Sequence, residues 1–558
     1  MISNMPAQKD FSKVPAGPSF RSVFNRSHAH KLTYDSGYLV PFFIDEVLPG
    51  DAADVRANIF ARLSSPLVHP IMDNIHIDTF YFFVPFRLVW EHWEEFMGAR
   101  EEKYDPNDPP SETDYIIPTY NPAEVAEGDL ADYYGIGQFS NGSGTADFNA
   151  LFFRGYNLIW NEWFRDENLQ DPVTVDTSDG PDTTSYELLK RGKRHDYFTS
   201  CLPFAQKGEE VGISLTGQAD VWGNGYGLGL TDGTVKMGPY EKATAGLDMS
   251  MSVQGYNLPL GTVFTPGQTA TSDSAVGIVT KNQGGTPATN NSGLIADLEG
   301  VSGISINDLR NSIAVQQVLE MDARSGTRYT EIIQSYFGVV NQDARLQRPE
   351  YLGGSSKMIN INPVTQTSQS DVTNEQYQGN QAAHGTFGCR SGYSKSFPEH
   401  GMVIGLASVR ADLTYQSGIP RMFNRSTRFD YYLPQFANLG EQEVLNREIF
   451  FTNNTGNDNG VFGYQERWAE MRYYPSRISG QFDSSATLSL DVWHLSQVFN
   501  NTPVLGDTFI EENPPLSRVL TVTEVDEEPV HEILQDTWIE YKHARPLPVY
   551  SVPGLRRL

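Results

Sequence analysis

The chain has 558 residues, enough for about three or four domains of ordinary size and for a large buried core. Its 69 acidic and 41 basic residues give a formal net charge of −28, which excludes a protein that compacts nucleic acid over its whole surface. Two cysteines, Cys201 and Cys389, are too few for a disulfide framework and indicate a reducing compartment. The N-terminus lacks a signal-peptide pattern and no apolar run matches a membrane span, so we expect no membrane insertion.

Aromatic residues are abundant, with 31 Phe, 27 Tyr and 8 Trp, whereas charged residues make up only 20% of the chain. Gly and Pro are also frequent, at 49 and 33 residues. This mixture is typical of a globular protein that is rich in β-strands and loops.

The N-terminal segment is basic in an otherwise acidic chain. Such a contrast predicts a partner, and a polyanion is the natural one. A flexible, solvated terminus explains the composition equally well. The basic residues are Lys9, Lys13, Arg21, Arg26 and Lys31.

Residues 73–84 alternate apolar and polar residues before an aromatic run, which predicts a strand that is buried first on one face and then on both. Pro85 ends this strand, and residues 88–98 predict a short helix. The spacing of the nearby histidines matches no metal-ligand pattern, so we interpret them as structural. These histidines are His69, His76 and His92.

Residues 148–172 predict a helix that carries an aromatic stripe. A stripe at helical spacing is typical of a core or a subunit interface, not of a cofactor site. Its aromatic residues are Phe153, Tyr156, Trp160, Trp163 and Phe164.

Residues 191–208, RGKRHDYFTSCLPFAQKG, form a dense motif. His195 and Cys201 could suggest a thiol nucleophile with its base, but the apolar residues around Cys201 indicate burial, which opposes thiolate formation. The cluster of Arg191, Lys193 and Arg194 could contact phosphate or pair with another subunit.

The composition changes at Gly208, where Gly, Thr, Ser and Asn begin to dominate, and no arginine occurs between Arg194 and Arg310. A long, weakly charged insertion of this kind predicts a projecting surface loop or small subdomain that carries recognition. An inert decoration remains the alternative. The aromatic candidates for contacts are Trp222, Tyr226 and Tyr256.

Residues 305–354 predict a helical docking segment. Ser305 and Asp308 form a helix-start signal, apolar residues then recur at helical spacing, and a second short helix is expected over 329–338. Arg345 and Arg348 follow among acidic and aromatic residues, a setting in which guanidinium groups usually fix loops or subunit contacts.

The rest of the chain predicts further strands over 402–415, 427–433 and 488–495, and an extended C-terminal docking tail over 543–558. Residues 462–480 mix charged and aromatic side chains in a way that suits a buried interface. Glu466 and Glu470 could instead be a glycosidase acid pair, although neighbouring arginines favour structural pairing. The interface candidates here are Glu466, Arg467, Trp468 and Arg472.

Taken together, these segments resemble the major capsid protein of gokushoviruses, members of the microvirus family (Microviridae) of small icosahedral phages with circular single-stranded DNA. The matching blocks occur in the family's order across nearly the whole chain. They are LVPFFIDEVLPGD (39–51), FFVPFRLVWEHWEEFMG (82–98), RGKRHDYFTSCLPFAQKG (191–208), RYTEIIQSYFGV (328–339), DARLQRPEYLGG (343–354), FGYQERWAEMRYYPSR (462–477) and RPLPVYSVPGL (545–555).

The resemblance implies a mainly β fold, an eight-stranded antiparallel jelly roll of the viral capsid type with long loop insertions that contain several short helices. It also implies a T=1 shell of sixty copies that is assembled in the host bacterial cytoplasm and encloses the genome. The implied partners are packaged single-stranded DNA, a small basic DNA-packing protein, a scaffolding protein and a bacterial surface receptor. No catalysis, cofactor or metal is implied.

On this basis we divide the chain into four parts. Residues 1–40 are expected to be an inward-facing basic arm that touches DNA, and 41–207 the first part of the jelly roll with long loops and helices. Residues 208–300 are expected to be the Gly-rich protrusion at the threefold axes, where host recognition is proposed, and 301–558 to hold the helical docking segment, the remaining strands and the C-terminal tail.

Two alternatives from other classes remain open at this stage. One is a carbohydrate-active β-sandwich enzyme that uses carboxylates of the 462–480 segment. The other is a carbohydrate-binding adhesin or fibre built on the Gly-rich insertion, although a fibre should show internal repeats and none is visible.

Overall fold

The computed structural model describes residues 21–97, 115–140, 147–208, 306–324, 346–368, 378–525 and 528–550, together with short strand segments between 220 and 297 and positions 335 and 337. The chain divides into two compact units, one formed by Met1–Lys207 with Glu320–Leu558 and the other by Gly208–Leu319.

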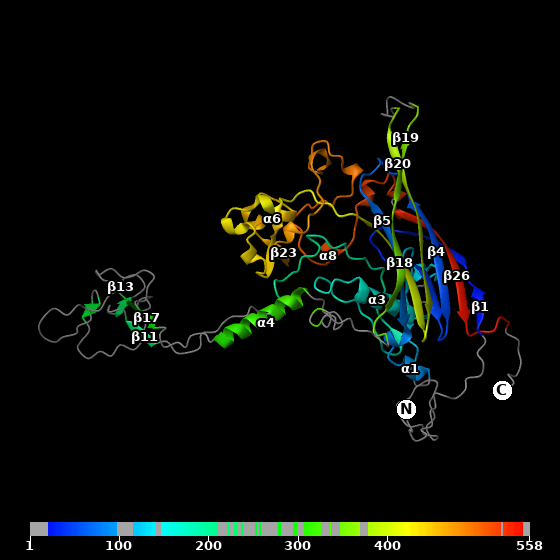
Figure 1. Cartoon of the computed structure of the whole chain (residues 1–558), viewed down its shortest axis with the longest axis horizontal. Helices are drawn as coiled ribbons and strands as arrows, with labels where there is room; N and C mark the ends of the chain where they lie inside the picture. The colour runs from blue at the N-terminus through cyan, green and yellow to red at the C-terminus, as the bar shows by residue number, and fades with distance from the viewer. Residues whose placement is uncertain are drawn as a thin grey trace, which may run out of the picture. The chain divides into compact units, whose positions relative to one another are not determined.

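The first unit is built on two antiparallel sheets (Figure 1). The six-stranded sheet has the order β1-β26-β4-β20-β19, and β2 also pairs with β26. Its strands are β1 (Ser22–Asn25), β2 (His28–Tyr34), β4 (Ala52–Leu63), β19 (Asn360–Thr365), β20 (Gln381–Ser396) and β26 (Ile533–Arg545). The four-stranded sheet has the order β18-β5-β21-β3. Its strands are β3 (Val40–Val47), β5 (Ile75–Pro85), β18 (Glu350–Met358) and β21 (Gly401–Ala411).

Consecutive strands cross between the two sheets, which is the mark of a jelly roll. The chain passes from β3 to β4 and back to β5, and later from β20 to β21, changing sheet each time. The strands β18 and β19 are separated only by buried Ile359 and belong to different sheets. The mainly β jelly roll predicted from the sequence is confirmed, as are the predicted strands over 73–84 and 402–415, found as β5 and β21.

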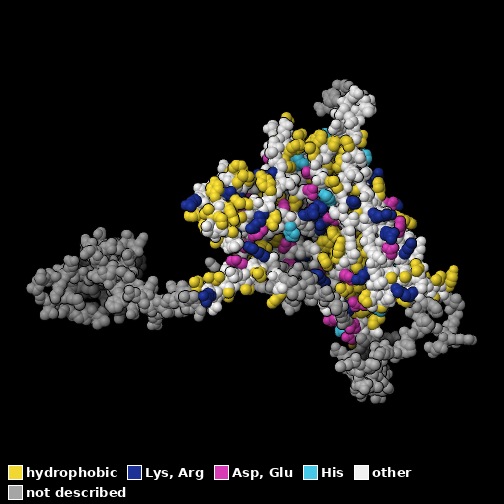
Figure 2. Space-filling model, viewed as in Figure 1, with side chains coloured by type: hydrophobic (Ala, Val, Ile, Leu, Met, Phe, Trp, Pro, Cys, Tyr) yellow, Lys and Arg dark blue, Asp and Glu magenta, His cyan; other side chains and the backbone are white. Residues whose placement is uncertain are grey.

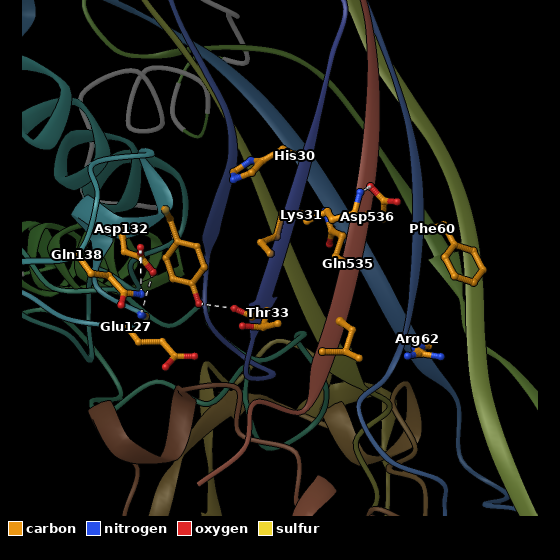
Figure 3. Close-up of a pocket in the computed structure, with 14 residues that line it drawn as sticks. His30, Lys31, Thr33, Phe60, Arg62, Glu127, Asp132, Gln138, Gln535 and Asp536 are labelled. Carbon is orange, nitrogen blue, oxygen red and sulfur yellow. Dashed lines mark hydrogen bonds and ion pairs between the residues drawn. The ribbon is translucent and has the colours of Figure 1, made fainter. Parts of the chain in front are cut away.

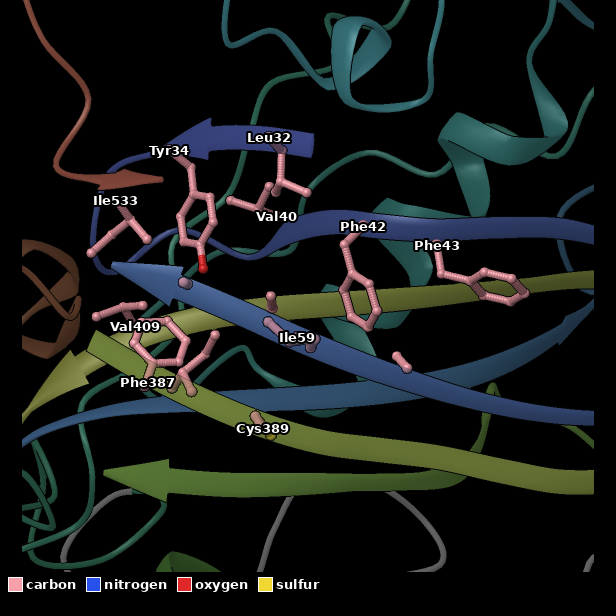
Figure 4. Packing of buried hydrophobic residues seen from close by; sticks show 14 of the residues in the cluster. Leu32, Tyr34, Val40, Phe42, Phe43, Ile59, Phe387, Cys389, Val409 and Ile533 are labelled. Atoms are coloured by element: carbon pink, nitrogen blue, oxygen red, sulfur yellow. The ribbon is translucent and has the colours of Figure 1, made fainter. Parts of the chain in front are cut away.

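The main core lies between the two sheets, where side chains from both inner faces meet (Figure 4). In β4 and β26 every second residue is buried, because a strand turns alternate side chains to opposite faces. The hydroxyl of buried Tyr34 donates to Gln535 Oε1 at 2.6 Å, which satisfies two polar groups inside this core.

A second layer covers the outer face of the four-stranded sheet. All of β21 is buried, since its outward residues Met402, Ile404 and Leu406 pack under helix α3 (Leu151–Trp163). A Cβ on Gly155 would lie 2.6 Å from the sulfur of Met402, so glycine allows α3 to approach the sheet. The predicted aromatic stripe is therefore core, with Phe153, Tyr156 and Trp160 buried.

A smaller core joins the 191–208 motif to the chain beyond β21. It contains Tyr197, Cys201, Tyr415 and Phe462, and it lies beneath the hairpin of β22 (Glu441–Leu445) and β23 (Val461–Glu466).

The remaining elements of the first unit are short. Its helices are α1 (Trp93–Phe96), α2 (Leu130–Tyr133), α6 (Asn446–Ile449), α7 (Thr455–Asp458) and α8 (Asp507–Ile510). Its 3-10 turns are Phe86–Leu88, Arg421–Phe423, Arg428–Asp430, Pro434–Phe436, Ala469–Met471, Gly480–Phe482, Asp491–Trp493 and Leu516–Arg518. Its minor strands are β6 (Thr119–Tyr120), β7 (Glu124–Val125), β8 (Phe139–Ser140), β9 (Phe148–Asn149), β10 (Pro181–Asp182), β24 (Glu524–Val525) and β25 (Glu528–Pro529).

The second unit contains short strands and most of helix α4 (Ile306–Arg324), which confirms the first helix predicted there. Its strands are β11 (Asp220–Gly223), β12 (Leu228–Thr231), β13 (Lys236–Met237), β14 (Ser252–Val253), β15 (Tyr256–Asn257), β16 (Gly277–Thr280) and β17 (Leu294–Asp297). The second helix predicted over 329–338 lies almost wholly outside the described residues.

Several sequence predictions need correction. The strands expected over 427–433 and 488–495 are loops that contain the 3-10 turns Arg428–Asp430 and Asp491–Trp493. The segment expected to be an N-terminal arm contains two strands from Ser22 to Tyr34, both paired with β26. Residues 543–545, expected in the tail, end β26 itself. Among the described helices, none is long and apolar enough to cross a membrane.

Candidate functional site

The 462–480 segment holds charge pairs, as expected. Glu466 at the end of β23 pairs with Arg472 at 2.5 Å, and the guanidinium of Arg467 lies 5.2 Å from the centre of the Trp468 ring. The loop is tight because Trp468 adopts a left-handed backbone conformation with φ of 68°, which is rare for a bulky residue. The buried packing around Trp468 must therefore stabilise this backbone conformation.

Trp468 lies inside the subunit, not on its surface. Its side chain is buried, its indole N–H donates to the carbonyl of Phe436 at 3.1 Å, and Tyr432 packs edge-on against its ring at 5.4 Å. This burial weakens the case for a direct contact between Trp468 and a second subunit, which the sequence suggested. The Trp468 ring instead packs against the loop that contains Tyr432 and Phe436.

Two further carboxylates of this region are bound to arginines. Glu470 pairs with Arg425 at 3.1 Å, and buried Glu448 pairs with Arg421 at 2.9 Å. Burial raises the pKa of Glu448 in spite of Arg421. Since Glu466 and Glu470 each pair with an arginine, the geometry favours structural pairing over a glycosidase acid pair.

A pocket of about 470 Å³ opens beside these pairs, between residues 415–425 and 470–479. Exposed hydrophobic side chains surround it, and Figure 2 shows such side chains gathered over the region of α6 and β23. Arg425 connects the pocket to this surface, since its guanidinium lies 5.5 Å from the Tyr431 ring. We define the aromatic surface as Met422, Phe423, Phe429, Tyr431, Tyr432, Met471, Tyr473 and Tyr474.

The sequence reading missed most of this surface. Only the second half of the run RMFNRSTRFDYY (421–432) falls within the strand predicted over 427–433, and the apolar residues of the run do not alternate with polar ones. Aromatic residues interleaved with Arg and Asn, without either regular period, were the available signal for an exposed interaction loop.

The docking segment is described only in part. The guanidinium of Arg348 lies 5.1 Å from the Trp163 ring, and the indole of Trp163 donates to the carbonyl of Pro349 at 2.9 Å. Arg348 is thus fixed against α3, while Arg345 lies outside the described residues.

The 191–208 motif is structural. Arg191 and Arg410 both bind the carboxylate of Asp78, at 2.6 and 2.9 Å, and largely buried Lys193 lies 4.6 Å from the Phe509 ring. These contacts inside the subunit disfavour the suggested phosphate or intersubunit role for Arg191 and Lys193.

The thiol of Cys201 is buried and donates to the carbonyl of Tyr197 at 3.4 Å. Burial raises its pKa far above the ordinary value, which suppresses the thiolate that a nucleophile needs. The geometry opposes a hydrolase built on this cysteine.

The three histidines considered as metal ligands have separate neighbours. His69 stacks on Trp493 at 4.9 Å, while His76 and His92 approach the carboxylates of Asp412 and Asp179 at 3.5 and 3.0 Å. Within the described parts of the chain, no group of three or more His, Cys, Asp or Glu side chains is placed to hold a metal ion.

The basic N-terminal residues differ in their surroundings. Arg26 pairs with Asp45 at 2.5 Å, Arg21 donates to the carbonyl of Gly50, and exposed Lys31 lies 3.3 Å from Asp536. The pairing with Asp45 weakens the case for Arg26 as a DNA contact. Lys9 and Lys13 lie outside the described residues.

A second hollow, of about 550 Å³, lies between β2 and residues 127–138 (Figure 3). Lys31 and Arg62 line it on the sheet side, and Glu127 and Asp132 line the other side. The hydroxyl of Tyr133 donates to the carbonyl of Thr33 at 2.7 Å and links the two walls. Because both basic and acidic side chains line this hollow, its charge favours neither an anionic nor a cationic ligand.

Of the recognition candidates in the Gly-rich insertion, Trp222 lies in β11 and Tyr256 in β15. Their side chains, and all of Tyr226, lie outside what the structure describes.

Comparison with known proteins gives a consistent result over nearly the whole chain. The family model described as "Capsid protein (F protein)" matches residues 12–555. The chain is 43% identical over 554 residues to a protein named "Capsid protein VP1" from Bdellovibrio phage phiMH2K, with 98% of each chain covered. It is 40% identical to a protein of the same name from Chlamydia phage 1 and 34% identical to one from Spiroplasma virus 4, again over 98% of each chain.

Proposed function

The chain belongs to the capsid protein (F protein) family, and from that membership we propose that sixty copies of it form a T=1 icosahedral shell around circular single-stranded DNA. In this proposal the protein is assembled in the host bacterial cytoplasm and resides in the virion. Packaging involves the phage's small basic DNA-packing protein and scaffolding protein. The basic N-terminal residues, Lys9 and Lys13 among them, face the DNA, and residues 208–300 bind the bacterial receptor.

The aromatic surface is the observation that carries the shell proposal. Phe423 and Tyr474 are 73% and 68% exposed, and such large side chains rarely gather on a monomer without a partner. Aromatic residues, Met and Arg are also the residue types enriched at protein interfaces. We therefore assign this surface, with Arg348, Arg467 and the Glu466–Arg472 pair, to contacts between copies of the chain.

The shell is tested by light scattering and negative-stain microscopy of the purified protein. Sixty subunits of 62.3 kDa give a closed particle of about 3.7 MDa. A stable monomer or trimer, with the phage partner proteins present, would contradict the proposal and revive the glycan-binding and enzyme alternatives.

Substitution tests the assignment of the surface. Phe423→Asp with Tyr474→Asp places two charges in the expected contact and should give folded subunits without shells. Val504→Asp is the matched control, because Val504 is 79% exposed outside the aromatic surface. Normal shells from the Phe423/Tyr474 variant would remove this surface from the interface.

A further inference from the structure

Among the described residues, the outer face of the six-stranded sheet is uncovered over β4 and β26, whereas the outer face of the four-stranded sheet lies under α3. On β4 and β26 the residues between the buried positions are exposed, and the register places them in rows across the strands. Trp538 lies opposite Asn58, Asp536 opposite Phe60, and Arg390 of β20 opposite Asn58 from the other side. Neighbouring strands lie about 4.7–4.9 Å apart, so these exposed rows form a continuous face that a ligand can reach.

This face is basic relative to the whole chain. It carries five basic residues, Lys31, Arg56, Arg62, Arg390 and Lys542, against three acidic ones, Asp54, Asp536 and Glu540, whereas acidic residues outnumber basic ones 69 to 41 in the full sequence. We call it the basic sheet face, and Figure 2 shows Lys and Arg side chains over β4 and β26.

Among the described residues, three of these cations have no acidic partner, although one of them, Arg390, donates its Nε–H to Asn58 Oδ1 at 3.0 Å. Lys31 and Arg56 pair with Asp536 and Asp54, each at 3.3 Å. Among the described residues, no carboxylate lies within 4.0 Å of the charged groups of the other three. These are Arg62, Arg390 and Lys542.

Two large apolar side chains are exposed among these charges. Phe60 is 55% exposed and Trp538 is 49% exposed. The register makes them diagonal neighbours on adjacent strands, so they lie about 7–8 Å apart. Across from Phe60 stands Gly388, where an added Cβ would meet nothing within 4 Å, so the ring is open on that side as well.

Exposed aromatic rings on a sheet, surrounded by Arg and Lys, are the elements that bind single-stranded nucleic acid, since bases stack on the rings while phosphates meet the cations. We propose that the basic sheet face binds the packaged single-stranded DNA, with bases on Trp538 and Phe60 and phosphates at Arg62, Arg390 and Lys542. The inference rests on the proposed function, which supplies the DNA. The proposed DNA site ends at the hollow beyond Arg62, because the carboxylates of Glu127 and Asp132 line that hollow and repel phosphate.

The test uses the full-length subunit, kept unassembled at low protein concentration, and a fluorescein-labelled oligo(dT) of about 20 nucleotides, a length that spans one or more binding sites. Fluorescence anisotropy gives the affinity over a range of salt concentrations. Arg62→Gln with Arg390→Gln should weaken binding at least about tenfold and lower the salt slope by about 1.4, from about 0.7 for each lost phosphate contact. Arg310→Gln with Lys357→Gln removes the same charge elsewhere and should leave both values unchanged.

Stacking is tested at Trp538. Trp538→Ala should weaken oligo(dT) binding about tenfold and Trp538→Tyr should restore most of it, because tyrosine still offers a ring. Duplex DNA of the same length should bind more weakly than the single strand, since its bases are already stacked.

Two results would overturn the inference. One is equal loss of affinity in the Arg62/Arg390 variant and its control, which would indicate general charge. The other is a folded Arg62/Arg390 variant that binds oligo(dT) normally but fails to assemble, which would make the face a subunit contact. If the wild-type chain formed no shells while this face still bound oligo(dT), the proposed function would fail and the binding face would stand.

Discussion

Arg154 Nε lies 2.7 Å from Asp182 Oδ2 in an ion pair whose two side chains have no solvent exposure. The pair joins α3 to β10 above the four-stranded sheet, and Asp182 also accepts from the hydroxyl of Tyr186 at 2.7 Å. Burial alone would raise the pKa of Asp182, but hydrogen bonds from Tyr186, Thr184 and Arg154 outweigh it and lower the pKa. The carboxylate therefore stays charged inside the apolar layer.

Removing one partner of this pair should be severe. Asp182→Ala should lower the free energy of unfolding by about 3–5 kcal/mol, because Arg154 would be left buried without its charge partner. Urea unfolding of the unassembled subunit measures the loss. Asp176→Ala is the control: its carboxylate is 35% exposed and lies 3.7 Å from Arg154, so we expect a loss of about 1 kcal/mol or less. An equal loss of unfolding free energy in both variants would show that the buried pair contributes no more to stability than the partly exposed one.

Substitution of Arg348, which stacks on Trp163, distinguishes an effect on assembly from an effect on folding. A partly exposed stack of this type contributes about 0.5–1 kcal/mol to stability, so Arg348→Ala, alone or with Arg345→Ala, should barely shift the urea midpoint. If these arginines also contact a second subunit, the yield of shells on a sizing column should fall much more than the stability does. An unchanged yield would remove both residues from the interface.

His531 should make stability depend on pH near neutrality. Its ring lies 3.3 Å from Asp35, and the hydrogen bond to Asp35 raises its pKa above the ordinary 6.5 although burial opposes this. Because the pKa of His531 is raised in the folded state, the contribution of its pairing with Asp35 to stability is complete below pH 6.5. This contribution is lost as the pH rises through the higher, folded-state pKa.

The variant that tests this is His531→Asn. The wild-type subunit should lose stability as the pH rises above about 6.5, and the variant should show a flatter profile over that window. Thermal melts at a series of pH values measure both curves, with His384→Asn, at an exposed position of β20, as the control. Parallel wild-type and His531→Asn curves would contradict the assignment.

Elements with a clear period and local cause could be predicted from the sequence. The alternation before Pro85 predicted β5, and the spacing of Phe153, Tyr156 and Trp160 predicted both α3 and its burial. The pairing of Glu466 with an arginine also followed from nearness in the chain.

Features that depend on distant partners could not be predicted in this way. Nothing near Ser22–Tyr34 indicates that this segment pairs with β26, because the partner strand lies about 500 residues further along the chain. The 427–433 and 488–495 runs are short and apolar, and such runs do not distinguish a strand from a packed loop. The burial of Trp468 depends on Tyr432 and Phe436, whose approach only the folded chain shows.

The Gly-rich insertion is suited to removal because its ends meet. The strands β11 and β17 are antiparallel and Asp220 pairs with Asp297, so their Cα atoms lie about 4.5–5.5 Å apart. Replacing residues 220–297 with a short Gly-Ser linker should therefore leave the first unit folded and still able to form closed shells, whose mass is lower only by the deleted residues. If the insertion binds the receptor, these particles should adsorb to host cells much more weakly than wild-type particles.

Alanine at Trp222, Tyr226 and Tyr256 in the full-length chain tests the same contact without a deletion. Insoluble deletion protein would make the insertion a structural element, and normal adsorption of the deleted particles would place host recognition elsewhere on the shell.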